Sequence, residues 1–181
     1  MCQLSCITYN RYKKSVKNLP AFCQVNPAFF GKKAEKIRED SRSMKILVID
    51  GQGGGVGSQC IAQPKEERET DWEIWAVGSN SMATSAMLKA GADAAATGES
   101  AVVYNAQRAD VILGPMGIAF AHSMMGEISP AMAAAVSGSE AKKLLIPMMR
   151  CHVQVMGVSP APLSAYIAEA VAQLHKMNDR L

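Results

Sequence analysis

The central and C-terminal parts of the chain alternate between short apolar runs and segments with a helical pattern. The run Lys-Ile-Leu-Val-Ile at 45–49 is typical of a strand buried on both faces. Near the C-terminus, Leu163, Ile167, Val171 and Leu174 instead fall on one face of a helix. This pattern predicts strands at 45–49, 73–77, 92–97, 110–114, 142–147 and 153–158. It predicts helices at 56–63, 81–90, 99–107, 116–125, 130–136 and 163–177.

The order of these elements predicts the class of fold. Repeated alternation of strand and helix indicates a parallel sheet with helices on both faces. Because crossovers between parallel strands are right-handed, it favours an α/β, doubly wound, Rossmann-like sheet. The run at 153–158 follows the fifth strand after only a few residues. It therefore predicts an antiparallel strand at the edge of an otherwise parallel sheet.

A glycine-rich segment joins the first predicted strand to the first predicted helix. Glycines let backbone amides approach a phosphate closely, and a helix N-terminus presents free N–H groups with a partial positive charge. In open α/β sheets, ligands bind beyond the carboxyl ends of the strands. We therefore expect a nucleotide or dinucleotide here. The predicted binding residues are Gly51, Gln52, Gly53, Gly54, Gly55, Val56 and Gly57.

The spacing of these glycines does not match the strict dinucleotide pattern GxGxxG, because residue 56 is valine. Gly51, Gly55 and Gly57 match GxxxGxG, whereas Gly51, Gly54 and Gly57 match GxxGxxG. No Lys-Ser/Thr pair follows, which argues against a P-loop. A tight turn would require one or two glycines, so five within seven residues favour a ligand over a purely structural turn.

The end of the second predicted strand leaves the choice of nucleotide open. NAD sites commonly have an Asp or Glu there, and NADP sites an arginine, but this chain has Gly78, Ser79 and Asn80. Ser79 and Asn80 are predicted to contact a ribose or a phosphate, although capping of the next helix is an equally good interpretation. Gly114 and Pro115 are expected to wall the same crevice. NAD or NADP is the expected cofactor, with another phosphate ligand as the alternative.

Four segments resemble an uncharacterised bacterial family of short, stand-alone proteins that carry a domain of unknown function. They are MKILVIDGQGGGVG, VGSNSMATSAMLKAGADAAATGE, ADVILGPMGI and GEISPAMAAAVSGSEAKKLLIP. The resemblance covers about residues 44–160 and implies a Rossmann-like fold, but no activity. A first helix that ends at Pro64 would depart from the family pattern.

Two residue pairs could carry chemistry, and neither is convincing. A short-chain dehydrogenase needs Tyr-x-x-x-Lys, but Tyr104 is followed by Arg108, and arginine is not a tunable base. Cys151 and His152 could act as nucleophile and base, but adjacent residues of a strand point to opposite faces. No group of residues has the spacing of a metal site.

Three acidic residues lie near the ends of predicted elements. Asp50 directly precedes the glycine segment, while Glu99 and Glu127 lie near helix starts. Each could be a general base in a cleft. Each could equally be a helix cap or a partner of the helix dipole.

Charge divides the chain into two parts. Residues 1–43 contain nine Lys or Arg and three acids, for a net charge of +6, whereas residues 44–181 have a net charge of −3. We interpret 1–43 as a basic, disordered leader and 44–181 as the nucleotide-binding domain. The odd number of cysteines, five, and the lack of a secretion signal argue against a disulfide framework, so the expected location is the cytoplasm. No predicted segment is long and apolar enough to cross a membrane.

These observations leave three hypotheses. The first is a small protein that binds a nucleotide at 51–57, with no activity assigned. The second is an NAD(P)-dependent oxidoreductase, or another nucleotide-using enzyme, in which Asp50, Glu127 or Cys151 is catalytic. The third is a non-catalytic nucleotide sensor or assembly partner. Twelve methionines are compatible with an adaptable core or with a contact between subunits, and hence with a homo-oligomer. Membrane and nucleic-acid partners are not expected.

Overall fold

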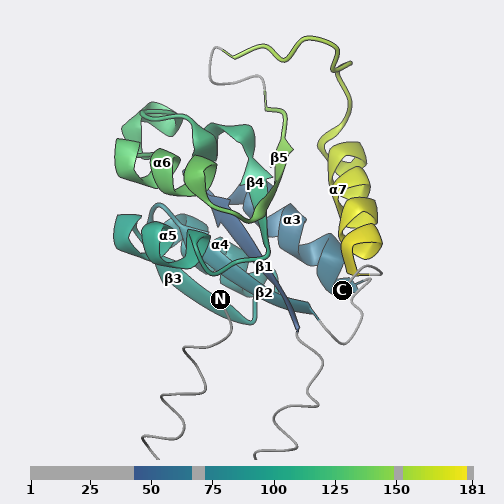
Figure 1. Ribbon diagram of the computed structural model, residues 1–181, viewed down its shortest axis with the longest axis horizontal. Helices are drawn as coiled ribbons and strands as arrows, with labels where there is room; N and C mark the ends of the chain where they lie inside the picture. Colours follow the sequence, from purple (N-terminus) through teal and green to yellow (C-terminus); the bar gives the residue numbers. More distant parts are fainter. Residues whose placement is uncertain (1–42, 67–71, 149–152, 179–181) are drawn as a thin grey trace, which may run out of the picture. The chain divides into compact units, whose positions relative to one another are not determined.

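The computed structural model describes residues 43–66, 72–148 and 153–178. In these residues, one parallel sheet lies between two layers of helices (Figure 1). The α/β class predicted from the sequence is therefore confirmed. The strands are β1 (Met44–Asp50), β2 (Trp72–Gly78), β3 (Ala94–Thr97), β4 (Val111–Pro115) and β5 (Lys142–Ile146).

The strands lie in the order β3-β2-β1-β4-β5, and every pairing is parallel. This is the order of a doubly wound sheet. The central strand β1 pairs with β2 along its whole length and with β4 over Ile46–Val48. The chain therefore adds strands on one side of β1, then crosses to the other. The carboxyl ends of β1 and β4 lie next to each other at this reversal.

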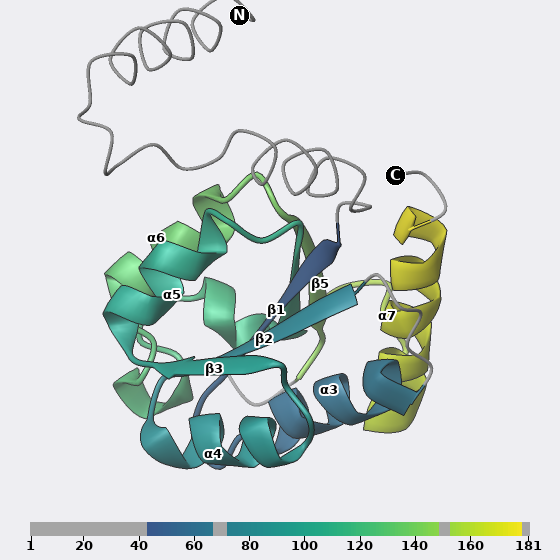
Figure 2. The same cartoon turned by 90° about the horizontal axis from the view of Figure 1, so that it is seen from below.

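The alternation of side chains along β1 builds two buried clusters. Ile46 and Val48 belong to one cluster, and Leu47 and Ile49 to the other, with all four at most 1% exposed. Each cluster is closed by its own layer of helices (Figure 2). One layer comprises α3 (Gly55–Glu66), α4 (Ser81–Lys89) and α7 (Leu163–Asn178). The opposite layer comprises α5 (Glu99–Ala106), α6 (Pro130–Gly138) and the short 3-10 helix η3 (Met116–Ala119).

Residues at the helix ends behave as their types predict. The Asn80 side chain accepts a hydrogen bond from the Ala83 amide at 2.9 Å and caps α4. Gly91, just beyond α4, has a φ of +108°. The Ser129 hydroxyl accepts from the Met132 amide at 3.2 Å and caps α6. Local capping thus fixes where these helices begin and end.

The predicted antiparallel edge strand at 153–158 is wrong. In the described residues every strand of the sheet is parallel, and 153–158 contain no strand. Gly157 has a φ of +83°, which breaks the extended run. Met156 is 81% exposed, so the segment lacks the buried face that would hold a strand in place.

The predicted helix at 116–125 is also wrong, because it is replaced by η3 and a second 3-10 turn, η4 (Met124–Gly126). Phe120 is extended, with φ −114° and ψ 121°, and it ends η3. The His122 amide donates a hydrogen bond to the Ile128 carbonyl at 2.7 Å. Backbone groups of this segment therefore pair with one another outside a regular helix.

Helix α3 runs through Pro64 rather than stopping before it. Gly57, Cys60, Ile61 and Pro64 are its buried residues, at the spacing of one helical face. Burial of the proline ring on this face offsets the hydrogen bond that its missing amide cannot make.

Two sequence-based interpretations fall outside the described part of the chain. They are the leader, apart from residue 43, and the pair Cys151 and His152. Among the described residues, no helix has both the length and the apolar character needed to span a membrane.

Candidate functional site

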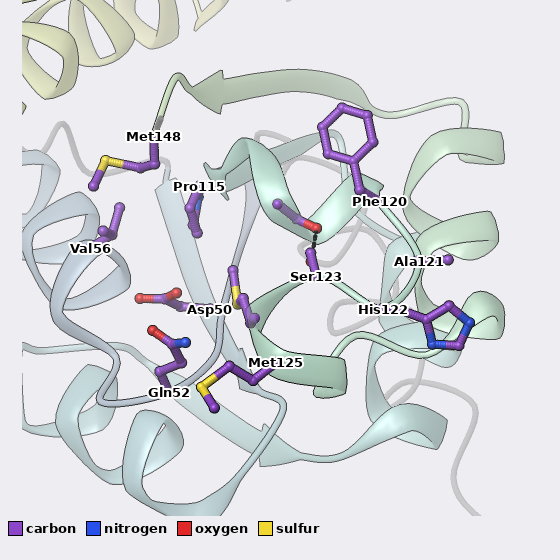
Figure 3. A pocket seen from close by; sticks show the side chains of 12 residues that line it. Asp50, Gln52, Val56, Pro115, Phe120, Ala121, His122, Ser123, Met125 and Met148 are labelled. Atoms are coloured by element: carbon purple, nitrogen blue, oxygen red, sulfur yellow. Dashed lines mark hydrogen bonds between the residues drawn. The ribbon is translucent and has the colours of Figure 1, made fainter. Parts of the chain in front are cut away.

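A pocket of about 470 Å³ opens at the carboxyl ends of β1 and β4, where the strand order reverses. The segment after β1 forms one wall, the chain after β4 forms another, and Met148 closes the side after β5 (Figure 3). Three predicted binding residues, Gln52, Val56 and Pro115, thus share one cavity. The full lining is Asp50, Gln52, Val56, Pro115, Gly117, Phe120, Ala121, His122, Ser123, Met124, Met125 and Met148.

The Asp50 carboxylate holds together the two ends of the glycine segment. Oδ1 accepts a hydrogen bond from the Gly51 amide at 2.8 Å, and Oδ2 accepts one from the Gly57 amide at 2.7 Å. Asp50 is only 4% exposed. Burial raises the pKa of Asp50 despite these hydrogen bonds, and the negative charge of Glu127 adds to the rise. Both oxygens are occupied by backbone amides, so Asp50 positions the segment.

Three of the glycines lie so close to neighbouring atoms that a side chain could be added only if those atoms shifted. A Cβ atom on Gly51 would lie 2.7 Å from Ser79 Oγ, and one on Gly57 would lie 2.5 Å from Met87 Sδ. Gly54 has a φ of +68°, and its Cβ would lie 2.8 Å from Ala83 Cα. The pattern GxxGxxG is therefore explained by the close approach of α4 to Gly54 and Gly57, and of side chains outside α3 and α4, such as Ser79, to Gly51.

The other two glycines of the segment, Gly53 and Gly55, have no such explanation. No atom lies within 4 Å of a Cβ built on either residue, and neither has a positive φ. Both are exposed. Among the described residues, their amides have no hydrogen-bond partner. Two bare amides thus lie at the N-terminal end of α3, where the helix dipole favours negative charge.

The Glu127 carboxylate joins Ser79 and Asn80 to the glycine segment by hydrogen bonds. Glu127 Oε2 accepts hydrogen bonds from Ser79 Oγ at 2.5 Å, from Asn80 Nδ2 at 2.8 Å and from the Gln52 amide at 2.8 Å. Asn80 Nδ2 also donates to the Gln52 carbonyl at 3.0 Å. The sequence indicates that Glu127 is a candidate base, but it does not predict that the Glu127 side chain lies beside the residues that follow β2. No local pattern could have revealed it, because its partners are 47 to 75 residues away along the chain.

Glu127 is held in its ionised form. Partial burial opposes ionisation, but hydrogen bonds from Ser79, the Gln52 amide and Asn80 outweigh it and lower the pKa of Glu127. The chain's own carboxylates therefore occupy the amides of Gly51, Gln52 and Gly57. Any other anion at this segment is left with the amides of Gly53 and Gly55.

The pocket wall formed by the segment between β4 and α6 has an unusual backbone. His122, Met124 and Met125 have φ values of +62°, +55° and +62°. Left-handed conformations cost residues other than glycine about 1–3 kcal/mol each. Ser123 Oγ donates to the Gly117 carbonyl at 2.5 Å (Figure 3), which holds the segment against η3.

The remaining predicted residues lie away from the pocket or have structural roles. Gly114 is buried inside β4, where a Cβ would lie 2.2 Å from the Ile49 carbonyl oxygen, and it does not line the pocket. Tyr104 is 58% exposed on α5. Arg108 lies over the Tyr104 ring, 3.6 Å from its centroid. Glu99 accepts a hydrogen bond from Ser129 Oγ.

Cys60 is a buried residue of α3 and belongs to the apolar core. Burial, with a smaller contribution from the charge of Asp50, raises the pKa of the Cys60 thiol to about 12. This thiol is therefore an inert core residue at neutral pH. Within the described residues, no group of three or more His, Cys, Asp or Glu side chains is arranged to hold a metal ion.

A family model described as a domain of unknown function, DUF3842, matches residues 45–179. No curated protein matches the chain. Among solved structures, AibC is similar with a TM-score of 0.42 and 19% identity over 76% of this chain. The match spans only 40% of the length of AibC. A universal stress protein in complex with cAMP has a TM-score of 0.36 and 18% identity, over 59% of this chain and 98% of that protein.

Proposed function

The chain belongs to the DUF3842 family, and we propose that this member binds a nucleotide or dinucleotide at the carboxyl ends of β1, β2 and β4. In this proposal the phosphates lie against the amides of Gly53 and Gly55. The rest of the ligand extends over these strand ends, and part of it enters the pocket beside Asp50 and Pro115. NAD and NADP are the dinucleotides we would test first.

The observation that supports this proposal most strongly is the bareness of Gly53 and Gly55. Nothing in the fold needs glycine at these positions, because neither packing nor a left-handed backbone excludes a side chain. A side chain there would instead cover the two amides that lack partners. Close approach of a ligand oxygen to the backbone is a reason for glycine that the fold itself does not supply.

The pocket supports a ligand larger than a phosphate alone. Its volume of about 470 Å³ lies within the range of about 300–1,000 Å³ that is typical of small-molecule sites. Its lining is largely apolar, with Met124, Met125 and Met148 on the walls and Asp50 as the buried polar group. Methionine side chains adapt their shape and make favourable contacts with aromatic rings, which suits a planar base.

Thermal-shift titration of the full chain with NAD, NADP, ADP and ATP tests the proposal. A nucleotide at 100 times its Kd should add about 2.7 kcal/mol to the free energy of unfolding and raise the Tm by several degrees. Gly55→Asp should abolish this rise, because it places a carboxylate where the phosphate is proposed to lie. The unliganded variant should keep its fold, because the side chain enters open space at a helix N-terminus.

Gly138→Asp is the matched control. Gly138 is also exposed, has no atom within 4 Å of a built Cβ, and lies at the end of α6. The Gly138→Asp substitution adds the same charge as Gly55→Asp, but it should leave the rise in Tm caused by the nucleotide unchanged. The proposal fails if none of the four nucleotides shifts the wild type. It also fails if the two variants respond alike.

A further inference from the structure

We infer that Glu127 is the acceptor for the ribose hydroxyls of the bound nucleotide, and that it selects a ribose without a 2′-phosphate. The inference rests on the proposed function and specifies the ligand class for that same site. In doubly wound folds this contact usually comes from an acid at the end of the second strand. Here β2 ends at Gly78 and is followed by Ser79 and Asn80. Glu127 supplies a carboxylate at that position from a distant part of the chain.

The hydrogen bonds of Glu127 leave one of its oxygens open. Oε2 receives all three bonds, from Ser79, Asn80 and the Gln52 amide. Among the described residues, Oε1 has no hydrogen-bond partner. A carboxylate fixed through one oxygen can accept hydroxyl hydrogen bonds at the other without losing its orientation.

The partners of Glu127 connect it to the proposed phosphate site. Gln52 lies between Gly51 and Gly53, and its amide donates to Glu127 at 2.8 Å. The open amide of Gly53 is therefore the next amide along the chain. A nucleotide whose phosphate contacts Gly53 and Gly55 would place its sugar within reach of residues at the ends of β1 and β2.

The charge around Glu127 disfavours a second phosphate on the sugar. Its described hydrogen-bond partners are all neutral, and no ion pair with Lys or Arg is formed by Glu127 in the described part of the chain. A 2′-phosphate would face this carboxylate with no cation between them. Hydroxyl groups instead gain hydrogen bonds to an ionised acceptor, which are among the stronger ones in proteins.

Isothermal titration calorimetry of the full chain with NAD and NADP measures this selectivity. The wild type should bind NAD more tightly than NADP by roughly tenfold or more, the size expected for a hydrogen bond to a charged group. Glu127→Gln should weaken NAD binding, so that the affinities for NAD and NADP differ by no more than about threefold. Glu99→Gln is the matched control, because Glu99 also accepts from a serine hydroxyl but lies on α5. It should leave the ratio unchanged.

A second comparison uses the wild type only, so it does not depend on the folding of a variant. ADP should bind more tightly than 2′-deoxy-ADP by about tenfold, because the deoxy compound lacks one of the hydroxyls that Glu127 accepts. Equal binding of ADP and 2′-deoxy-ADP would contradict the inference, as would equal binding of NAD and NADP.

The outcomes separate this inference from the proposed function. If Gly55→Asp abolishes binding but Glu127→Gln leaves the NAD to NADP ratio unchanged, the proposed function stands and the role of Glu127 is wrong. If Glu127→Gln strengthens the binding of NAD and NADP equally, Glu127 competes with the ligand for the site. This result would also overturn the inference. If no nucleotide binds the wild type, both proposals fail.

Discussion

Asp50 and Glu127 each use a carboxylate to hold backbone amides of the glycine segment. Asp50 joins Gly51 to Gly57, while Glu127 binds the amide of Gln52. The position of Asp50 could be predicted from the sequence, because it directly follows a buried strand. The position of Glu127 could not, because it depends on how the chain between β4 and α6 folds back toward β2. Residue type indicated an acid near the site, but only the fold shows which amides it binds.

The lowered pKa of Glu127 predicts how its contribution to stability depends on pH. A carboxyl group with a lower pKa in the folded than in the unfolded protein stabilises the fold above its unfolded pKa, which is 4.5 for this group. That stabilisation is lost as the pH falls through the folded pKa. Glu127→Gln should therefore lower the free energy of unfolding near neutral pH by less than about 1 kcal/mol, because solvent screens this partly exposed group.

Urea unfolding of the wild type and of Glu127→Gln near pH 7 and near pH 3 provides the measurement. The difference between the two proteins should be smaller near pH 3 than near pH 7, because protonation of Glu127 removes its ionised hydrogen bonds as the pH falls. A difference that stays constant or grows on acidification would contradict the hydrogen-bonding role of the ionised side chain.

The packing of α3 against the sheet separates the glycines into two groups. Gly57 faces Met87 and Asp50 at distances that leave no room for a side chain, whereas Gly55 faces open space. The sequence shows five glycines without this distinction, and the overlapping GxxxGxG and GxxGxxG matches assign them differently. The close approach of neighbouring elements decides which of them the fold requires.

This division predicts opposite effects for two small substitutions in α3. Gly57→Ala should lower the free energy of unfolding by about 1–3 kcal/mol, because its Cβ would lie 2.5 Å from Met87 Sδ and 2.8 Å from Asp50 Cβ. Gly55→Ala should leave it unchanged or raise it by a few tenths of a kcal/mol, because alanine restricts the unfolded chain. Urea titration of both variants measures the difference. Equal destabilisation would show that Gly55 is also required by packing.

Elements with a local cause could be predicted from the sequence, and those fixed by distant contacts could not. The apolar runs predicted β1, β2, β4 and β5 to within one residue at each end. The signal is clearest for β1 and β4, because buried parallel strands need continuous apolar sequence. The chain between β4 and α6 contains many apolar residues, which favoured a helix. Its left-handed residues, such as Met125, are held by tertiary contacts that a helical pattern cannot express.

The strand order of the sheet determines where the pocket lies. Because β1 and β4 are neighbours, the glycine segment after β1 and Pro115 at the end of β4 face one pocket. Alternation of strands and helices predicted this arrangement from the sequence. Ser79 and Asn80 follow β2 on the other side of β1, and they hold Glu127 rather than line the pocket.

In the proposed complex, the amides of Gly53 and Gly55 bind the phosphates of a nucleotide. Two-dimensional ¹⁵N–¹H NMR of the full chain during titration with ADP observes these amides directly. The Gly53 and Gly55 signals should move in a saturable way, while the signal of Gly138, another exposed glycine on α6, should stay in place. If ADP leaves the Gly53 and Gly55 signals unmoved, or moves the Gly138 signal as much, these amides do not form the phosphate site.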